Sequence, residues 1–542
     1  MRRHAIAAAV SGLALAALLA AAAVELAAAM PPRPVPYDEN GRQVAAGTGF
    51  DKSADAPPPG PGVNGVYPGK GAPRSGVARL PVLLVQFPTQ AGQISAATFN
   101  AMLFSVGTYA TGSLNDYFQE QGLTNVTGQV VNWVTAAQPK SYYVNGMSGM
   151  LNTYPMNSQG LVREAVLAAN PFINFRNFDN DGPDGIPGSL DDDGIVDCLI
   201  VVVAGYAAES YSPPSPRTEV WSHYWWLSAG AGPGALTVDG VKVDPYTIQS
   251  ELRGTSGNTV RDVGVFCHEY GHGLGAPDLW STCPAALQSS FGAWNGVGAH
   301  DLMGYGGWGA GGANPDRPFH MSGFTKALLG LANVITVDID RLNEPINAVE
   351  TSRDVYWISP VPWGTGVLVD QRIGSPTWDV QPWGLQGWFV ENRQPIGFDG
   401  GLPGSGLLVY HYNGLVAGQD YDSDGYNNYF DNAFEWSETQ PLLRLECPDQ
   451  TGADHALDND DLAAQNNLGD AGDYWSTATA TTFDLTTVPS SVPYSAPGGF
   501  TLMASQFAMA NVGLSGLVVN ADLIVGLTGG PNHDVWIKDC LA

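Results

Sequence analysis

The sequence predicts an α+β fold, in which a mixed region of strands and helices precedes a β-rich region. Between residues 80 and 274, short apolar runs typical of buried strands alternate with helical segments. From about residue 334, the pattern changes to short alternating apolar runs separated by Gly, Pro, Asn and Asp. This spacing is typical of an all-β module, and we expect a β-sandwich. A chain of 542 residues has room for both regions as separate domains.

In the first region, the clearest helix runs from Ser113 to Gly122. Ser113 can cap its start, Asp116 stands three residues later as in a capping box, and Gly122 can end it. A helix at residues 319–331 should close the region. The expected strands of the first region span residues 80–87, 126–134 and 198–204. Those of the β-rich region span residues 334–339, 387–391, 406–411 and 517–525.

The N-terminal 29 residues have the features of a secretory signal peptide. Arg2 and Arg3 precede an almost unbroken apolar run, and Ala27 to Ala29 offer small residues for cleavage. A membrane anchor is the alternative, but the small Ala-rich run ending in A-x-A favours removal. No later stretch is long and apolar enough to span a bilayer. We therefore expect an extracellular protein, either free or associated with the cell surface. Residues 30–78 are rich in Pro and Gly and predict a linker or a short prosegment.

The composition argues against nucleic acid and anionic membrane surfaces as partners. Asp and Glu number 52 against 23 for Lys and Arg, which gives a formal net charge of -29. Phosphate-rich surfaces repel a protein of this charge. The acidic residues gather in stretches rich in Asp, Asn and Gly, which favours calcium-binding loops over a repelling tail.

The strongest functional signal is H-E-x-x-H at residues 268–272. His268 and His272 are four apart on a predicted helix, so both imidazoles can hold one zinc ion. Glu269 can take a proton from a water on that zinc. A turn after the helix would bring Asp278 round as a third protein ligand. Three protein ligands with an open fourth position are the pattern of catalytic zinc, whereas the alternative is a helix whose histidines only form hydrogen bonds.

The helix that carries this motif should have recognisable ends. We expect Asn258 or Thr259 to cap its start. Gly273 and Gly275 let the chain leave the helix, and Pro277 prevents the helix from continuing.

The extended pattern H-E-x-x-H-x-x-G-x-x-D at residues 268–278 resembles the metzincin metallopeptidases, with Asp278 where most of them carry His. The Asp, within Gly-x-Pro-Asp-Leu, is similar to the immune inhibitor A-like branch of secreted bacterial metallopeptidases. The likeness extends to the first strand, to the N-D-Y-F-Q-E-Q helix and to E-N-R-Q at residues 391–394. It implies a metzincin-like zinc peptidase domain over residues 79–333, followed by the β-rich module over residues 334–542.

The same resemblance implies roles for Met303 and Tyr305. Metzincins place a Met in a tight turn beneath the zinc, which implies this structural role for Met303; an ordinary core Met is the alternative. In some metzincins a Tyr at the offset of Tyr305 moves on and off the zinc. Tyr305 is therefore a candidate catalytic residue that donates to the developing oxyanion, whereas a packed or substrate-lining Tyr is the alternative. Asp301, two residues before Met303, could serve only as outer support.

Two acidic stretches predict calcium sites. The first has acids at loop positions 1, 3, 5 and 12 and Gly at position 6, which matches a calcium-wrapping loop; a plain polar turn is the alternative. Its candidate ligands are Asp420, Asp422, Asp424 and Asp431. The second stretch is dense in hard oxygen ligands directly before a buried strand. Its candidate ligands are Asp179, Asp181, Asp191, Asp193 and Asp197.

Together these patterns predict a secreted zinc-dependent endopeptidase that hydrolyses peptide bonds of extracellular proteins, with Glu269 as general base and calcium as a structural ion. The alternative is a secreted, metal-stabilised binding or surface-matrix protein without turnover. An intact Glu269 weighs against that alternative, because a purely structural zinc site does not need this carboxylate. We expect His223, His300 and His320 to be packed and hydrogen-bonded, with the first two as substitutes should Asp278 not be a ligand.

Overall fold

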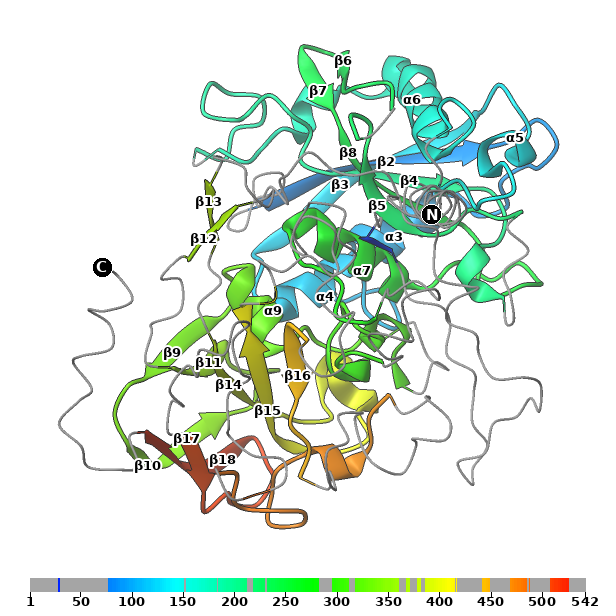
Figure 1. Ribbon diagram of the computed structural model, residues 1–542. Coiled ribbons are helices and arrows are strands. Elements are labelled where there is room, and N and C mark those ends of the chain that lie inside the picture. The colour runs from blue at the N-terminus through cyan, green and yellow to red at the C-terminus, as the bar shows by residue number, and fades with distance from the viewer. Residues whose placement is uncertain are drawn as a thin grey trace, which may run out of the picture.

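In the computed structural model, the chain forms a mixed sheet with helices and, toward the C-terminus, two further large sheets and a two-stranded one (Figure 1). The prediction of an α+β fold is therefore confirmed. Among the described residues, no helix combines the length and the apolar character needed to cross a membrane. The structure describes residues 28–29, 77–150, 153–182, 184–211, 218–229, 232–281, 295–310, 317–359, 367–370, 378–381, 386–414, 416, 441–448, 468–484, 487 and 507–525.

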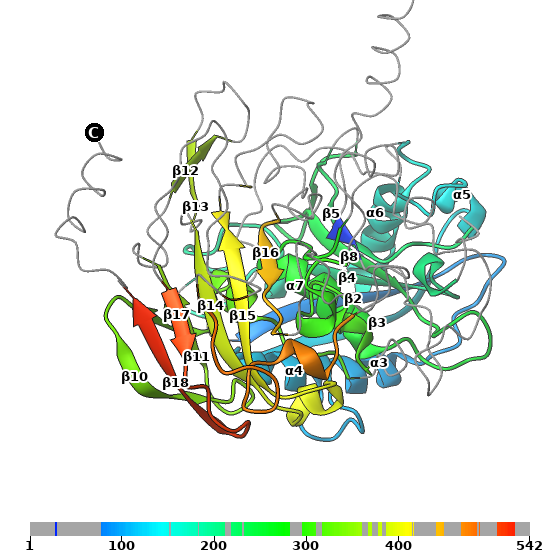
Figure 2. The same cartoon turned by 60° about the horizontal axis from the view of Figure 1, so that its bottom comes forward.

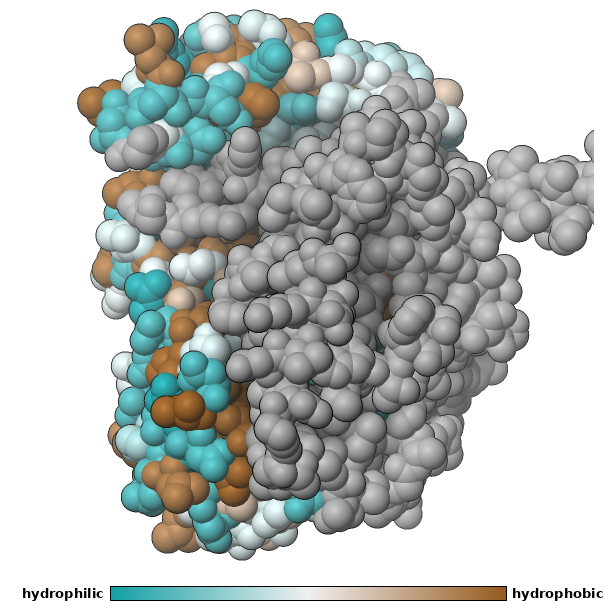
Figure 3. Space-filling view, turned by 60° about the vertical axis from the view of Figure 1, so that its left-hand side comes forward, coloured by the Kyte–Doolittle hydropathy of each residue, from teal (hydrophilic) through white to brown (hydrophobic). Residues whose placement is uncertain are grey.

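Several predictions concern residues that the structure does not describe. Apart from residues 28–29 and 77–78, the expected signal peptide and linker lie outside the described residues, and so does the whole acidic loop at 420–431. On the face shown in Figure 3, the described residues present hydrophilic and hydrophobic groups side by side.

The first region is built on a six-stranded sheet with the order β1-β5-β8-β4-β2-β3. The four strands β8, β4, β2 and β3 run parallel, whereas β5 is antiparallel to β8 and β1 is antiparallel to β5. The apolar runs of β2 and β4 are buried because a parallel sheet is covered on both faces. The strands are β1 Ala28–Ala29, β2 Val77–Gln86, β3 Asn125–Thr135, β4 Leu199–Val203, β5 His223–Trp226 and β8 Pro245–Ser250. A hairpin of β6 Leu236–Val238 and β7 Val241–Val243 lies beside them.

The three strands that we predicted in this region are confirmed as β2, β3 and β4, and the predicted helix from Ser113 is confirmed as α4. Ser113 and Asp116 form the expected capping box, and Gly122 ends the helix with a positive φ of 116°. An added Cβ at Gly122 would lie 2.9 Å from the Leu331 carbonyl oxygen, so space also requires glycine here. The helices are α3 Ala96–Phe104, α4 Leu114–Gln121, α5 Lys140–Val144, α6 Ser158–Ala169, α7 Val263–Leu274 and α9 Gly323–Leu328.

The predicted start of the motif helix α7 is wrong. The helix begins after Asp262, and neither Asn258 nor Thr259 caps it. The preceding residues pair with another segment instead, since Arg253 donates its backbone N–H to Thr259 and Arg261 donates its own to Glu251. Asn258 and Thr259 therefore lie in a segment that forms backbone hydrogen bonds before the helix, and their side chains do not cap it. The predicted end is confirmed, because Gly275 terminates α7 with a φ of 107°.

The β-rich region contains a five-stranded sheet with the order β16-β15-β14-β11-β9 and a three-stranded sheet with the order β10-β18-β17. The four strand predictions for this region are confirmed as β9, β14, β15 and β18. The first sheet comprises β9 Asn333–Val337, β11 Asp354–Ile358, β14 Gln386–Arg393, β15 Gly406–Asn413 and β16 Leu443–Leu445. The second comprises β10 Arg341–Asn347, β17 Phe507–Ala510 and β18 Val518–Val525, while β12 Val367–Asp370 pairs with β13 Trp378–Gln381.

The five-stranded sheet is covered on both faces (Figure 2). Phe389 and Tyr412 pack on Phe324 of α9, with the Phe324 and Tyr412 rings 5.3 Å apart. The alternating residues Trp388 and Val390 join the core of the three-stranded sheet. The two faces thus belong to two hydrophobic clusters. The cluster that contains Phe389 and Tyr412 runs without a break from the six-stranded sheet into the β-rich region.

Candidate metal centre

Helix α7 brings the two motif histidines together. His268 and His272 lie one turn apart, with Nε2 atoms 3.2 Å apart and nearly perpendicular rings. Both side chains are buried, as is that of Glu269 beside them. The spacing of the H-E-x-x-H motif therefore produces the expected pair of converging imidazoles.

The turn after α7 brings Asp278 to the same point. The chain reverses at Gly275, and the Ala276 N–H donates to the Gly271 carbonyl at 3.0 Å. Asp278 Oδ1 then lies 3.3 Å from Nε2 of His268 and 3.3 Å from Nε2 of His272. The Asp278 carboxylate also accepts a hydrogen bond of 2.9 Å from Trp280 Nε1, which fixes its orientation.

Backbone carbonyls determine which ring nitrogens carry hydrogen. His268 Nδ1 lies 2.9 Å from the Leu302 carbonyl oxygen, and His272 Nδ1 lies 2.8 Å from that of Ala276. A carbonyl oxygen only accepts, so each Nδ1 must donate and each neutral ring presents a lone pair at Nε2. Two imidazole lone pairs and the Asp278 carboxylate thus converge on one point, and a cation there would satisfy all three.

Burial and charge act in opposite directions on Asp278. Burial alone would raise the pKa of its carboxyl group, but the adjacent imidazoles, in their protonated form, hold this pKa below its ordinary value. The group is therefore ionised, as a metal ligand must be. Among the described residues, no other His, Cys, Asp or Glu joins this cluster.

Met303 lies against α7 where the helix has no side chain. An added Cβ at Gly271 would be 2.6 Å from Met303 Sδ. The Met303 carbonyl accepts from the Leu279 N–H at 2.9 Å, next to Asp278. Met303 is fully buried, and its backbone connects the turn at 301–304 to the segment that carries the third candidate ligand.

Asp301 holds this turn rather than joining the cluster. Its carboxylate accepts from the Met303 N–H at 2.6 Å, the Ser322 N–H at 2.7 Å and the Thr325 hydroxyl at 2.6 Å. Burial raises the pKa of Asp301 in spite of these bonds. The expectation that it acts as outer support agrees with these contacts.

Tyr305 is packed among aromatic residues. Its ring lies 6.3 Å from that of Trp280 and shares a hydrophobic cluster with Val265 and Trp308. Burial raises the pKa of Tyr305, so its hydroxyl keeps its proton and remains a donor.

The remaining histidines named above are hydrogen-bonded and buried. His223 Nδ1 lies 2.7 Å from the Trp221 carbonyl oxygen, and burial lowers the pKa of His223 to about 4. His300 Nε2 lies 2.8 Å from Asp473, and His320 Nε2 lies 2.7 Å from Glu120. Neither His223 nor His300 is part of the metal cluster, so these partners explain both residues without a metal.

A second acidic cluster unites three of the five carboxylates expected to hold calcium. Oxygens of Asp179, Asp181 and Asp197 lie within 4.8 Å of one another. Two neighbours lie outside the group: Asp191 is exposed and accepts from the Asp184 N–H, whereas Asp193 donates its N–H to Asp181.

The environment of this cluster is short of positive charge and donors. Burial, reinforced by nearby carboxylates, raises the pKa of Asp197 to about 9 and that of Asp179 to about 6. Within the described part of the chain, one buried side-chain oxygen each of Asp179, Asp197 and Asn180 has no hydrogen-bond partner. Asn180 was not among the candidate ligands, since an amide between two acids gives no separate signal in the sequence.

Comparisons with known proteins agree with the motif. Residues 92–332 match the immune inhibitor A peptidase M6 catalytic domain. Immune inhibitor A of Bacillus thuringiensis subsp. alesti is 28% identical over 257 residues, which cover 43% of this chain and 35% of that protein. The pre-pro-metalloprotease PrtV of Vibrio cholerae serotype O1 is 28% identical over 232 residues, covering 40% of this chain and 23% of PrtV.

The chain thus spans about a third of the length of one relative and about a quarter of the other. The matched residues include α4, the six-stranded sheet apart from β1 and β2, and all three residues of the candidate metal cluster. Residues 92–332 are therefore similar to the catalytic domain of the immune inhibitor A-like metallopeptidases.

Proposed function

We propose that this protein is a secreted zinc endopeptidase that cleaves extracellular proteins or peptides. The observation that carries the proposal is the convergence of His268, His272 and Asp278. The Nε2 lone pairs of the two imidazoles and the negatively charged carboxylate oxygen face a single point. Donors bound tetrahedrally at about 2.0 Å from an ion lie about 3.3 Å apart. The observed separations of 3.2 and 3.3 Å match this value. Two imidazoles and one carboxylate are a donor set that suits zinc.

The chain's own groups have distinct tasks in this scheme. When bound, zinc supplies Lewis acidity, which lowers the pKa of water and polarises a peptide carbonyl. Glu269 accepts the proton of the attacking water and passes it to the leaving amine. The carbonyls of Leu302 and Ala276 keep the histidine rings in the required tautomer. Met303 packs against helix α7 and supports it, and Tyr305 donates to the developing oxyanion.

The alternative is a secreted binding or surface-matrix protein that keeps the metal without turnover. The match to a peptidase catalytic domain and the buried Glu269 next to the candidate ligands favour the peptidase. A metalloprotease name among the relatives supports protein substrates, and the signal-peptide pattern of the first 29 residues supports export.

The first prediction separates metal binding from catalysis. Glu269→Gln should keep stoichiometric zinc but lose about 100-fold or more of the casein-cleaving rate, because the carboxylate that moves the proton is gone. Asp278→Ala should lose zinc, whereas Asp301→Ala should retain most of it. Zinc content by elemental analysis and peptide release provide the two measurements. A Glu269→Gln variant that cuts at the parent rate would refute the peptidase mechanism.

We also propose that calcium binds at Asp179, Asp181 and Asp197, with the Asn180 amide oxygen as a fourth donor. Hard oxygen ligands and a surplus of buried negative charge suit this ion. The Asp420, Asp422, Asp424 and Asp431 loop is proposed as a second calcium site on its spacing alone.

The second prediction tests the first of these sites. Calcium should raise the melting temperature of the parent protein at constant free zinc, because it binds only the folded state; saturation at 100 times Kd contributes about 2.7 kcal/mol. Asp197→Asn should lose most of this response. Asp191→Asn is the matched control, since Asp191 is exposed and outside the cluster. Equal calcium responses in the two variants would exclude the site.

We further propose two units, a metzincin-like peptidase domain over residues 79–333 and a β-rich module over residues 334–542. The module is proposed to be a β-sandwich, because side chains from its two sheets form one hydrophobic cluster.

A further inference from the structure

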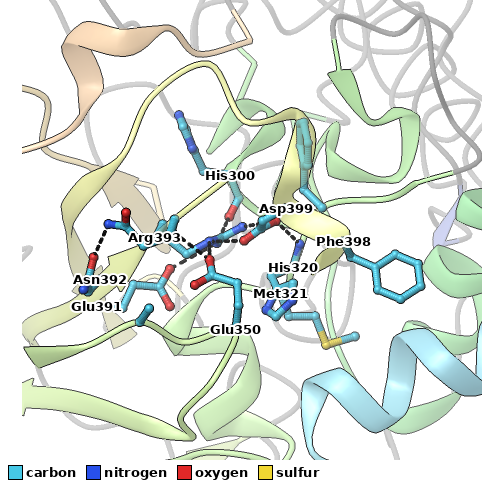
Figure 4. A network of polar contacts seen from close by, with 12 residues as sticks. His300, His320, Met321, Glu350, Glu391, Asn392, Arg393, Phe398 and Asp399 are labelled. Carbon is cyan, nitrogen blue, oxygen red and sulfur yellow. Dashed lines mark hydrogen bonds and ion pairs between the residues drawn. The ribbon is translucent and has the colours of Figure 1, made fainter. Parts of the chain in front are cut away.

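The guanidinium of Arg393 lies at the centre of a buried polar network at the end of β14 (Figure 4). Arg393 is fully buried and belongs to E-N-R-Q, the stretch of the β-rich region that resembles the family. It donates to both oxygens of Asp399, at 2.6 and 2.9 Å, and to Glu391 at 3.2 Å. A third carboxylate, that of Glu350, lies 3.8 Å away.

One arm of this guanidinium reaches the turn beside the metal cluster. Arg393 Nη1 donates to the His300 backbone carbonyl at 3.1 Å, and the Tyr410 hydroxyl lies 3.3 Å from the same oxygen. His300 stands two residues before Leu302, whose carbonyl oxygen accepts from His268 Nδ1. Only a short, buried piece of backbone therefore separates Arg393 from the group that orients the first histidine.

A second series of hydrogen bonds connects Arg393 to Leu302. Asp399 Oδ1, held by Arg393, accepts the His320 N–H at 2.8 Å. The His320 carbonyl in turn accepts the Leu302 N–H at 3.2 Å. The two peptide units that precede the Leu302 carbonyl are thus both held, and both lines of contact end at the Arg393 guanidinium.

We propose that Arg393 is a positioning residue for the metal centre and that the β-rich region is therefore part of the active site's framework. Through His300 and Asp399, Arg393 sets the Leu302 carbonyl, which sets the tautomer and direction of the His268 ring. This inference rests on the proposed role of His268 as a zinc ligand. Outer contacts of this kind typically change metal affinity by about 10- to 100-fold.

The chemistry of the network explains why arginine is required. Four acceptor oxygens of Asp399, Glu391 and His300 receive the planar, forked guanidinium. Lysine would keep the charge but presents a point-like ammonium that cannot span these acceptors. Arg393→Lys therefore removes the geometry while limiting the loss of buried charge.

The test measures zinc affinity of the full-length protein by competition with a chromogenic chelator. Arg393→Lys should weaken zinc binding about 10-fold or more and change the visible absorption of the cobalt-substituted protein. Tyr410→Phe, which removes a single hydroxyl from His300, should give a smaller change in the same direction. Asn392→Ala is the matched control: Asn392 is the adjacent buried residue of β14, and its amide donates to Ile346 and Gly516 on the other side of the sheet.

The outcomes distinguish the inference from the proposed function. Loss of zinc affinity in Arg393→Lys, with parent-like affinity in Asn392→Ala at comparable loss of melting temperature, supports the positioning role. If Arg393→Lys is folded and binds zinc and cobalt as the parent does, the inference is wrong while the zinc site stands. If Arg393→Lys does not fold, Tyr410→Phe with unchanged affinity and cobalt spectrum overturns it. A parent protein that binds no zinc would instead reject the proposed function.

Discussion

Tyr305 has a buried ring and a protonated hydroxyl, a combination that suits both a wall residue and an oxyanion donor. Its packing on Trp280 places it next to the partner of Asp278, because Trp280 Nε1 donates to that carboxylate. If the hydroxyl donates only in the transition state, its loss should affect turnover and leave ground-state binding unchanged.

The third prediction is that Tyr305→Phe lowers kcat by about 100-fold, the usual effect of losing one oxyanion donor, with little change in KM or zinc content. Peptide cleavage kinetics and elemental analysis would measure this. Tyr270→Phe, the same change in α7 at a ring packed on Phe118, is the control. Parent-like kcat in Tyr305→Phe would reduce Tyr305 to a packing residue.

At this scale, the sequence predicts ligands better than the groups that orient them. The four-residue spacing places His268 and His272 on one helix face, and the glycines after them allow Asp278 to return. The carbonyl acceptors at Leu302 and Ala276 are invisible to such reasoning, because every residue has a carbonyl and only tertiary structure selects one.

The contact between α7 and the 301–304 turn depends on an absent side chain. Gly271 lies inside the helix, where alanine would ordinarily be favoured by about 1 kcal/mol. Here an added Cβ would lie 2.6 Å from Met303 Sδ, closer than any normal contact. Overpacking of this kind costs about 1–3 kcal/mol and should outweigh the gain in helix propensity.

The fourth prediction is that Gly271→Ala lowers the free energy of unfolding by about 1 kcal/mol and weakens zinc binding, because it displaces the turn that holds Leu302. Gly273→Ala is the matched control in the same helix, since its added Cβ would meet Cys198 Sγ at 3.0 Å. Urea unfolding and chelator competition give the two measurements. Greater stability in Gly271→Ala than in Gly273→Ala would contradict the proposed packing.

Whole elements were predictable where their signals are local. Helix α4 carries its capping box and its glycine stop within ten residues, and its bounds agree with the prediction. The helix expected at 319–331 is shorter, Gly323–Leu328, because the backbone N–H groups of Phe319, His320 and Met321 bond to distant residues. Such long-range partners leave no mark in the local pattern.

Across the whole molecule, the five-stranded sheet is the middle layer. Its alternating side chains belong to two cores, one continuous with the core around the six-stranded sheet and one shared with the three-stranded sheet. The sequence predicted strands here from their alternation, but it could not reveal that both faces are covered. The buried Glu391, Arg393 and Asp399 are neighbours in the chain, but they meet the buried Lys326 from a distant segment, which the sequence does not suggest.

Glu350 makes this junction sensitive to pH. Burial and the neighbouring Asp399 carboxylate raise the pKa of Glu350 to about 8, although Arg393 acts in the opposite direction. Lys326 also faces this group, and burial lowers the pKa of Lys326. In the unfolded chain Glu350 should titrate near its ordinary pKa of about 4.3. Between these values the folded protein binds the extra proton, so this contribution to stability is present at low pH and is lost as the pH rises toward 8.

The fifth prediction follows from this loss of stability as the pH rises. Glu350→Gln stays neutral, so its free energy of unfolding relative to the parent should increase between pH 5 and pH 8.5, by on the order of a few kcal/mol. Chemical denaturation across this range would measure the difference. Glu344→Gln, the same change at a partly exposed position in β10, should show a much smaller trend. If the free energies of unfolding of both variants follow that of the parent at every pH, then Glu350 is ionised in the folded protein, and the junction between the first region and the β-rich region holds that charge at neutral pH.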